Sequence, residues 1–313
     1  MEQEEVLRVA GLTKKFPAKK GASFFTVVQN VSFKLHKGEV LGILGPNGAG
    51  KTTLMHMLLS LLKPSSGTIT YFGKDFFSHR STLLQDISFA SSYAQLPAQL
   101  SVRTNLDIYG QLYGISREER AQRIENYLKR FDIWNLVDKE TGVLSAGQLT
   151  RVILTKAFLT HPRIVLLDEP TASLDPESAQ SVRTFIQEQQ KEQGLSLIIT
   201  SHNMEEVRQI CSRVLVLRQG EIIANDTPEA LASSVSHTGV TLTTSMPQEL
   251  TQWLSDRSVP FTRNGDEIAV KINEQDLAQF LIQLTQAGIS YSDLAINKPT
   301  LHDYFMAIAR DHS

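Results

Sequence analysis

The sequence of 313 residues contains a single cysteine, Cys211. An intrachain disulfide is therefore impossible, and a metal site built from several cysteines is excluded. The chain also lacks an excess of one charge, because 31 lysines and arginines stand against 33 aspartates and glutamates, for a net charge of −2. Nucleic-acid-binding proteins usually carry a strong basic excess, so no nucleic acid is expected as a partner.

Long apolar runs are missing as well. No stretch of about 18 consecutive apolar residues occurs, as a membrane-spanning helix would need. The first five residues, Met-Glu-Gln-Glu-Glu, lack the basic start and apolar core of a secretory signal. We therefore expect a protein that stays in the cytosol and does not cross a bilayer by itself. An apolar content of 41% is ordinary for a globular protein.

Residues 45–52 read Gly-Pro-Asn-Gly-Ala-Gly-Lys-Thr and fit the pattern G-x-x-x-x-G-K-[ST]. They follow the apolar run 40–44, which predicts a buried strand, and they precede residues 54–62, which predict a helix. This order directs several backbone N–H groups and the positive end of the helix dipole at one point. The segment therefore predicts a phosphate-binding loop and a nucleoside triphosphate as the ligand.

Each part of this loop has an expected task. Lys51 would reach the β- and γ-phosphates, and the Thr52 hydroxyl would bind Mg²⁺. Glycines allow backbone conformations and a close approach that a Cβ would block. The residues expected to surround the nucleotide phosphates are Gly45, Pro46, Asn47, Gly48, Ala49, Gly50, Lys51, Thr52 and Thr53.

A second group of candidate residues follows two further apolar strands. Residues 164–167 predict a strand that ends in Asp168 and Glu169, and residues 197–200 predict one that ends near His202. Asp168 would hold Mg²⁺ opposite the phosphate loop, directly or through water. Glu169 would accept a proton from the attacking water or orient it. A third strand of the same sheet would bring His202 to the γ-phosphate.

Residues 144–148, Leu-Ser-Ala-Gly-Gln, introduce a helix expected over 149–159. Small residues at a new helix N-terminus make a second anion-binding surface. By its position this surface lies away from the phosphate loop of its own chain. We therefore expect a two-fold dimer in which each chain completes the site of the other.

The coarse pattern predicts an α/β fold. Strands and helices alternate over about residues 1–230, as in a parallel sheet covered by helices, and a helical subdomain is expected over about 93–150. The nucleotide-binding domain would span 1–232, and a small C-terminal α+β module would span 240–313. Predicted strands at 240–243, 267–272 and 289–295 alternate with helices at 248–255 and 275–287, which resembles a βαββαβ sandwich.

The chain ends in a helix expected over 301–309, with a stripe formed by Leu301, Tyr304, Phe305 and Ile308. The stripe would close the core of the small module or pack against a second subunit. No phosphate loop or catalytic set occurs in this module. Its expected role is therefore assembly or regulation.

Together these motifs resemble those of an ATP-binding cassette (ABC) ATPase, a P-loop NTPase cassette with a mixed sheet and a helical subdomain. The resemblance covers about residues 5–230 and includes the phosphate loop, residues 144–148, the acidic strand, residues 173–175 and His202. It implies that Phe16 stacks on adenine, with Phe24 or Phe25 as substitutes. It also implies that Ser145, Gly147 and Gln148 belong to a motif facing the partner's γ-phosphate, and that Asp175 couples the two sites.

Two departures from the family pattern stand out. Ala146 replaces the usual glycine, and its methyl group keeps the backbone N–H. The glutamine that usually touches Mg²⁺ and meets the membrane subunit is replaced by Ser92. Gln95, three residues later, is an alternative for this role.

The resemblance implies an ATPase subunit that uses ATP and Mg²⁺, pairs with a second ATPase subunit as a homodimer, and drives a separate membrane permease. It would lie on the cytoplasmic face of the membrane, held there by the permease. Residues 298–305 are similar to the tails of drug- and polymer-export ATPases, so export is the expected direction. The alternatives are a soluble ABC ATPase acting on ribosomes or chromosomes, and an importer ATPase with a regulatory ligand-binding C-terminal domain.

Overall fold

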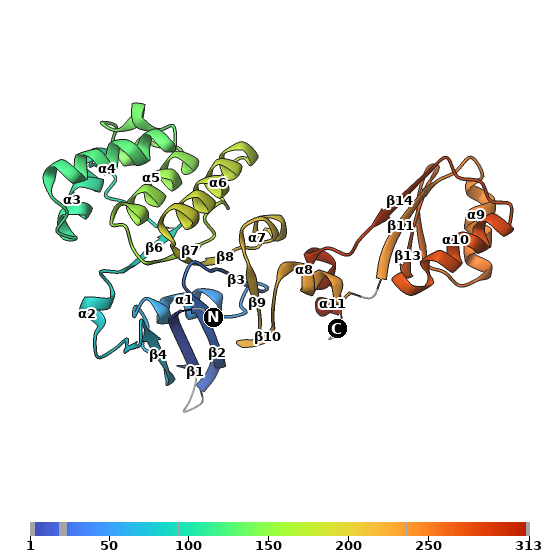
Figure 1. The fold of residues 1–313 in the computed structure, drawn as a ribbon, viewed down its shortest axis with the longest axis horizontal. Helices are drawn as coiled ribbons and strands as arrows, with labels where there is room; N and C mark the ends of the chain where they lie inside the picture. Colours follow the sequence, from blue (N-terminus) through green and yellow to red (C-terminus); the bar gives the residue numbers. More distant parts are fainter. Residues whose placement is uncertain (1–3, 19–23, 93, 236, 311–313) are drawn as a thin grey trace. The chain divides into compact units, whose positions relative to one another are not determined.

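The computed structural model describes residues 4–18, 24–92, 94–235 and 237–310. The chain divides into two compact units, Met1–Thr227 and Pro228–Ser313 (Figure 1). The helix Pro228–Ser233, which the sequence analysis assigned largely to the first domain, groups with the second unit because it packs against the C-terminal helix. Within the described residues, no helix has both the length and the apolar character that a membrane span requires.

A six-stranded sheet forms the centre of the first unit. Its order is β10-β9-β3-β8-β7-β6, in which β10 is antiparallel to β9 and the other strands are parallel. Every residue of β3, β7 and β8 is buried, as the continuous apolar runs predicted. The strands are β3 (Val40–Leu44), β6 (Ile87–Ser91), β7 (Ile164–Asp168), β8 (Ser196–Thr200), β9 (Arg213–Arg218) and β10 (Glu221–Asp226).

Several helices of this unit begin at side chains that cap their first turn. Ser145 and Asp175 each accept a hydrogen bond from the backbone N–H three residues on, at the starts of α5 and α6. Ser116 does the same for α4 in the helical segment, which also holds α3 and two short 3₁₀ turns. The elements are α2 (Arg80–Leu83), α3 (Val102–Leu112), α4 (Arg117–Arg130), η1 (Trp134–Leu136), η2 (Thr141–Val143), α5 (Ala146–Leu159), α6 (Pro176–Gln193) and α7 (Met204–Ile210).

The helix after the phosphate loop, α1 (Lys51–Leu58), is shorter than the predicted 54–62 and begins earlier. It ends because Ser60 adopts a left-handed conformation with φ of 55°. The Leu61 N–H then donates to the His56 carbonyl, and the Ser60 N–H donates to the Met57 carbonyl. This pair of bonds closes the helix, and the apolar run beyond it is not helical.

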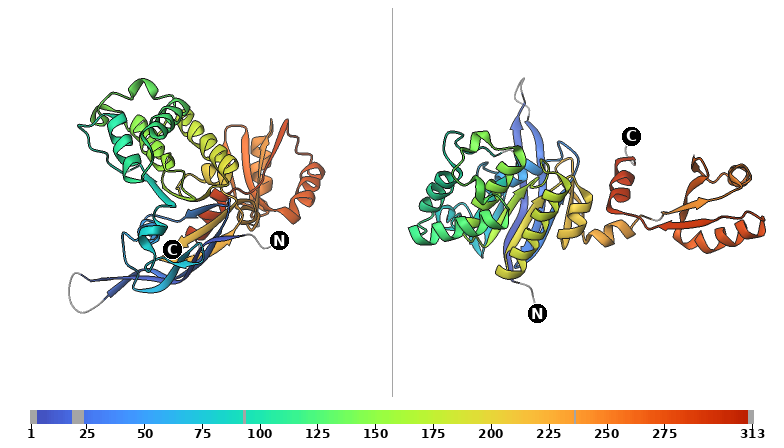
Figure 2. Two further views of the ribbon diagram at one scale, coloured as in Figure 1. Left: turned by 60° about the vertical axis from the view of Figure 1, so that its left-hand side comes forward. Right: turned by 90° about the horizontal axis from the view of Figure 1, so that it is seen from above.

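The parallel-sheet prediction was wrong for the N-terminal segment. Strands β1 (Glu5–Pro17) and β2 (Phe24–His36) form a long antiparallel hairpin, visible in blue in Figure 2. With β4 (Ser66–Tyr71) and β5 (Lys74–Asp75) they make a separate antiparallel sheet of order β2-β1-β4-β5. Buried side chains of this sheet, of α1 and of β3 share one core. This second sheet therefore holds α1 against the strand that precedes the phosphate loop.

The second unit contains the predicted βαββαβ arrangement, with a four-stranded antiparallel sheet of order β12-β13-β11-β14. Its core lies between this sheet and α9 and α10, which cover the same face (Figures 1 and 2). Its elements are β11 (His237–Thr243), α9 (Pro247–Asp256), β12 (Phe261–Asn264), β13 (Glu267–Asn273), η3 (Glu274–Asp276), α10 (Leu277–Gln286) and β14 (Asp293–Asn297).

Two details of the second unit differ from the sequence analysis. Strand β12 was not among the predicted segments, because three of its four residues are exposed and it has no apolar alternation. The last strand spans 293–297 instead of 289–295, since Gly288 turns the chain with φ of 74° and Ile289 packs into the core.

The C-terminal helix α11 (Leu301–Arg310) packs against α8 (Pro228–Ser233) of the same unit. Leu301 is 2% exposed, and Tyr304 and Phe305 are half-buried. The predicted apolar stripe is therefore covered in part within its own unit, where α11 packs against α8.

Candidate nucleotide site

The phosphate loop opens a cavity of about 590 Å³ at the carboxyl end of β3. Residues of the loop and the two carboxylates that follow β7 line the same cavity, because parallel strands end at the same edge of the sheet. Predicted residues on its wall are Asn47, Gly48, Ala49, Gly50, Lys51, Thr52, Thr53, Asp168 and Glu169. Gly45 and Pro46 lie just behind, where the loop leaves β3.

Two glycines of this loop have a clear steric requirement. A Cβ on Gly45 would lie 2.3 Å from the Leu217 carbonyl oxygen of β9. Gly50, the residue before α1, has φ of 102°, and a Cβ there would lie 2.7 Å from the Val27 carbonyl oxygen. The loop fits between β9 and β2 only because both positions lack a side chain.

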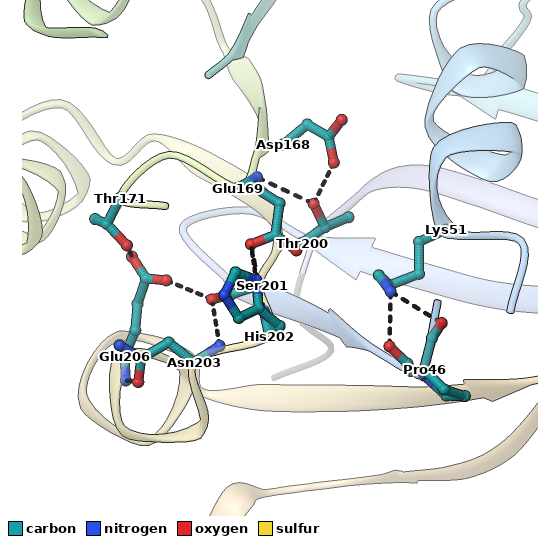
Figure 3. Close-up of polar contacts among 11 residues, drawn as sticks. Pro46, Lys51, Asp168, Glu169, Thr171, Thr200, Ser201, His202, Asn203 and Glu206 are labelled. Carbon is teal, nitrogen blue, oxygen red and sulfur yellow. Dashed lines mark hydrogen bonds and ion pairs between the residues drawn. The ribbon is translucent and has the colours of Figure 1, made fainter. Parts of the chain in front are cut away.

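Lys51 is folded back on its own loop. Its ammonium donates to the Gly45 carbonyl at 2.6 Å and to the Pro46 carbonyl at 3.2 Å (Figure 3). Burial lowers the pKa of Lys51, and the carboxylates of Glu169 and Asp168 oppose this shift. The ammonium is therefore held over the loop at the wall of the cavity that the two carboxylates share.

The ends of β7 and β8 are joined by side chains. The Thr200 hydroxyl donates to Asp168 Oδ1 at 2.5 Å, and the Glu169 N–H donates to the Thr200 carbonyl at 3.0 Å. His202 Nδ1 lies 2.7 Å from Glu169 Oε2, with 70% of the histidine side chain exposed and 14% of the glutamate (Figure 3). The structure thus brings Asp168, Glu169 and His202 together at the ends of β7 and β8, as predicted from the two apolar runs that precede them.

The donor set at the cavity fits Mg²⁺. Thr52 offers a hydroxyl and Asp168 a carboxylate on the same wall, and Mg²⁺ binds oxygen ligands from one or two such groups together with substrate phosphates. No cluster of three or more histidine, cysteine or acidic residues that could hold a metal occurs among the described residues. A metal here would depend on the phosphates for its remaining ligands.

Residues of the Leu-Ser-Ala-Gly-Gln segment lie outside this cavity, at the N-terminus of α5. Ser145 and Gln148 form a complete capping box, in which each side chain accepts the other's backbone N–H at 3.3 and 3.0 Å. Ser145 is exposed, and Gly147 lies against Leu174. The motif presents its helix end to the surface of its own chain.

Asp175 has its carboxylate occupied within its own chain. Oδ1 accepts the Ser178 N–H at 3.0 Å and Oδ2 accepts the Ser178 hydroxyl at 2.5 Å. These hydrogen bonds hold the pKa of Asp175 below its usual range. The carboxylate caps α6 at an exposed position, and its coupling role across a dimer stays a prediction.

His202 contacts Glu169 but does not itself line the cavity, and three further predicted residues lie outside it as well. Ser92 follows β6 with its hydroxyl buried and without a hydrogen-bond partner among the described residues, while the neighbouring Ser91 does line the cavity. Gln95 is exposed and does not line it either. Phe16 is half-buried and stacks on Phe25 with ring centroids 5.8 Å apart. Their roles toward metal and adenine stay predictions.

Two residues that bind the site residues or their loops were not predicted from the sequence. Thr200 was read only as a strand end, although its hydroxyl binds Asp168. Glu206 was not among the predicted site residues, and its carboxylate accepts hydrogen bonds from the Thr171 and Ser201 hydroxyls. The sequence signals for these two are a threonine at the end of an apolar strand and an acidic residue in the first turn of the following helix.

The ABC transporter family model matches residues 28–172 of this chain. The ABC transporter ATP-binding protein NatA of Bacillus subtilis is 36% identical over 230 residues, which cover 73% of this chain and 92% of that protein. The Nod factor export ATP-binding protein I of a Rhizobium species is 30% identical over 307 residues, covering 96% of this chain and 95% of the relative.

Solved structures agree with this match at the level of the fold. An ATP-binding cassette solved as a dimer in a post-hydrolysis state, bound to ADP and Pi, has a TM-score of 0.64 with 23% identity. The match covers 71% of this chain and 98% of that one. The phosphate loop, the acidic strand and the fold define a P-loop nucleotide-binding cassette. The chain belongs to the ABC transporter family, as an ATP-binding protein with the ATPase domain of that family.

Proposed function

We propose that this protein hydrolyses Mg-ATP at a site shared by two copies of the chain, and that the reaction drives a separate membrane permease. The observation that carries this proposal is the contact between Glu169 and His202, 2.7 Å apart, beside the cavity that Lys51 and Asp168 also line. A degenerate, binding-only site would have no need for this pair.

In this reaction water attacks the γ-phosphorus and the bond to the ADP oxygen breaks. Glu169 accepts the proton of the attacking water or orients it, and His202 contacts the γ-phosphate. Lys51 exchanges its bonds to the loop carbonyls for bonds to the β- and γ-phosphates. Bound Mg²⁺ supplies charge neutralisation on the phosphates, with Thr52 and Asp168 as its protein ligands.

The dimer rests on the position of the second motif. Ser145 is exposed at a helix N-terminus and lies outside the cavity of its own chain. A cassette of the same fold was solved as a dimer. In a head-to-tail pair this helix end would contact the γ-phosphate bound by the partner, together with Gly147.

Export is the proposed direction of transport. Relatives whose names carry an export or resistance function match nearly the whole chain, the second unit included. The permease would hold the protein on the cytoplasmic face of the membrane. Detergent purification from the native membrane, followed by ATPase assays with the co-purified permease, would test this. ATP turnover that does not respond to the permease would contradict it.

The test of hydrolysis itself is Glu169→Gln, which keeps the side-chain shape but removes the base. We expect phosphate release to fall by about a hundredfold or more, with ATP binding kept and the ATP-bound dimer accumulating in sedimentation. Glu221→Gln, an exposed glutamate on β10, serves as the control. Near-normal phosphate release from Glu169→Gln would disprove the assignment.

A further inference from the structure

Glu206 lies in the first turn of α7 and is 1% exposed. Such burial is rare for a carboxylate, and no cationic group of the described residues forms an ion pair with it. Thr171 donates its hydroxyl to Glu206 Oε1 at 2.8 Å, and Ser201 donates its hydroxyl to Oε2 at 2.5 Å (Figure 3). Each carboxylate oxygen therefore binds a different loop.

The direction of these bonds follows from the neighbouring backbone. The Asn203 N–H donates to the Ser201 hydroxyl oxygen at 3.0 Å, so the hydroxyl hydrogen of Ser201 is left for Glu206. Burial raises the pKa of Glu206, and the hydrogen bonds from Ser201 and Thr171 oppose that shift. Both oxygens act as acceptors, and an amide in place of the carboxylate could satisfy only one hydroxyl in the same way.

The two loops that Glu206 joins are those of Glu169 and His202. Thr171 follows Glu169 by two residues, and Ser201 directly precedes His202. The contact between Glu169 and His202 closes a ring that passes through Glu206. Movement of either loop would therefore have to break a bond to Glu206 or the contact between the two site residues.

The backbone of Glu169 needs such support. Its φ of 53° lies in the left-handed region, which is uncommon for a residue with a side chain. Such a conformation persists only where the surroundings hold it. Thr200 holds it on one side, through bonds from the Glu169 N–H to its carbonyl and hydroxyl oxygens. The bond between Thr171 and Glu206 holds the chain on the other side.

We propose that Glu206 is a positioning residue for hydrolysis, which keeps Glu169 and His202 aligned by binding Thr171 and Ser201. This proposal rests on the proposed function, in which Glu169 and His202 act on the attacking water and the γ-phosphate. Glu206 itself does not line the cavity, so it is not expected to touch ATP.

The test is Glu206→Gln in the full-length protein, measured by steady-state ATP hydrolysis. We expect kcat to fall about tenfold, with the KM for ATP changed by less than about twofold, because the loss falls on alignment and not on binding. Glu205→Gln is the matched control, since this neighbouring glutamate is exposed and bonded to Arg208. It should leave both constants unchanged.

Two further variants keep the test valid if Glu206→Gln folds poorly. Thr171→Val and Ser201→Ala each remove one hydroxyl and should each lower kcat by a part of this loss. Combined with Glu206→Gln, either should add little, because residues in one network are not additive. Full additivity would overturn the proposal, as would an unchanged kcat or a loss confined to KM.

Failure of the proposed function gives a different result. If Glu169→Gln also kept normal turnover, the assignment of hydrolysis to Glu169 would fall first. If Glu169→Gln abolished turnover while Glu206→Gln and both hydroxyl variants kept the wild-type kcat, only the role of Glu206 would be disproved.

Discussion

The two units differ in how their sheets arrange polar groups. In the six-stranded sheet, β3, β7 and β8 are parallel, so the loops after them meet at one edge and form one cavity. In the four-stranded sheet of the second unit all neighbours are antiparallel, and successive strands end at opposite edges. The parallel arrangement places the side chains that follow several strands at one edge, whereas the antiparallel arrangement places them at two opposite edges.

The four-stranded sheet of the second unit has one face covered by α9 and α10 and one face of small and polar residues. Gly239, Thr241 and Thr243 alternate on β11 with the buried Val240 and Leu242. This is the pattern of a half-covered antiparallel sheet, with a small core on one side. Every residue that lines the nucleotide cavity belongs to the first unit, and a role of the second unit in assembly or regulation stays a prediction.

The largest expected effect concerns the core of the second unit. Trp253 is 9% exposed and contacts Phe280 with ring centroids 5.7 Å apart. Trp253→Ala should lower the free energy of unfolding of this unit by about 3–5 kcal/mol. Hydrogen exchange should rise in 237–297 and not at the six-stranded sheet, and Tyr291→Ala, at a more exposed position, should do little. Equal exchange in both units would mean that they unfold together.

The phosphate loop should be affected next. Lys51→Ala removes the ammonium that would reach the nucleotide, and it should weaken ATP binding by about tenfold to a hundredfold. The matched control is Lys271→Ala, an exposed lysine on β13 of the other sheet. Calorimetry measures both variants. A comparable loss of ATP affinity in Lys271→Ala would contradict the assignment of nucleotide binding to the first unit alone.

A smaller effect is expected after β6. Ser92 is shorter than glutamine and does not line the cavity, so Ser92→Gln could reach the metal that Thr52 and Asp168 would hold. We expect basal ATPase activity to rise about two- to threefold, because the glutamine amide oxygen would add a metal ligand that Ser92, outside the cavity, does not supply. Gln95→Ala should lower activity only if Gln95 has taken over this role. Unchanged ATPase activity of both variants, with and without the permease, would mean that the loop contributes neither to metal binding nor to coupling with the permease.

The smallest effect is expected from removing the second unit. A chain that ends at Thr227 keeps every residue that lines the cavity, and it leaves no exposed α8 behind. Its affinity for ATP should stay within about twofold of that of the full chain, since every residue that lines the cavity belongs to the first unit. Loss of ATP binding by a folded truncated protein would show that nucleotide binding requires the second unit.

Much of the first unit could be predicted from the sequence, because buried parallel strands are continuous apolar runs. The strand Val40–Leu44 was predicted with the observed bounds, and the strand that ends at Asp168 was also found. The cavity residues of the phosphate loop and the acidic strand were found, since both have characteristic patterns and spacings. Val27, His56, Phe89, Ser91 and Ala94 also line the cavity and were not predicted. ATP binding follows from the family to which the chain belongs.

The remaining features depend on contacts that local patterns do not encode. The hairpin of β1 and β2 pairs with β4 across a gap in sequence that contains β3 and α1. Glu206 has the sequence position of a capping-box partner, and only the approach of the Thr171 and Ser201 loops turns its carboxylate inward. Long-range strand pairing decides the first case, and the hydroxyl groups available to the Glu206 carboxylate decide the second.

The single thiol offers a labelling probe for one unit alone. Cys211 is 7% exposed, and a Cβ on Gly42 of β3 would lie 3.0 Å from its sulfur. Burial raises the pKa of Cys211, so the reactive thiolate is scarce while the sheet is closed. Because the second unit has no cysteine, the rate at which a thiol reagent modifies the chain reports the opening of the six-stranded sheet without any signal from the other.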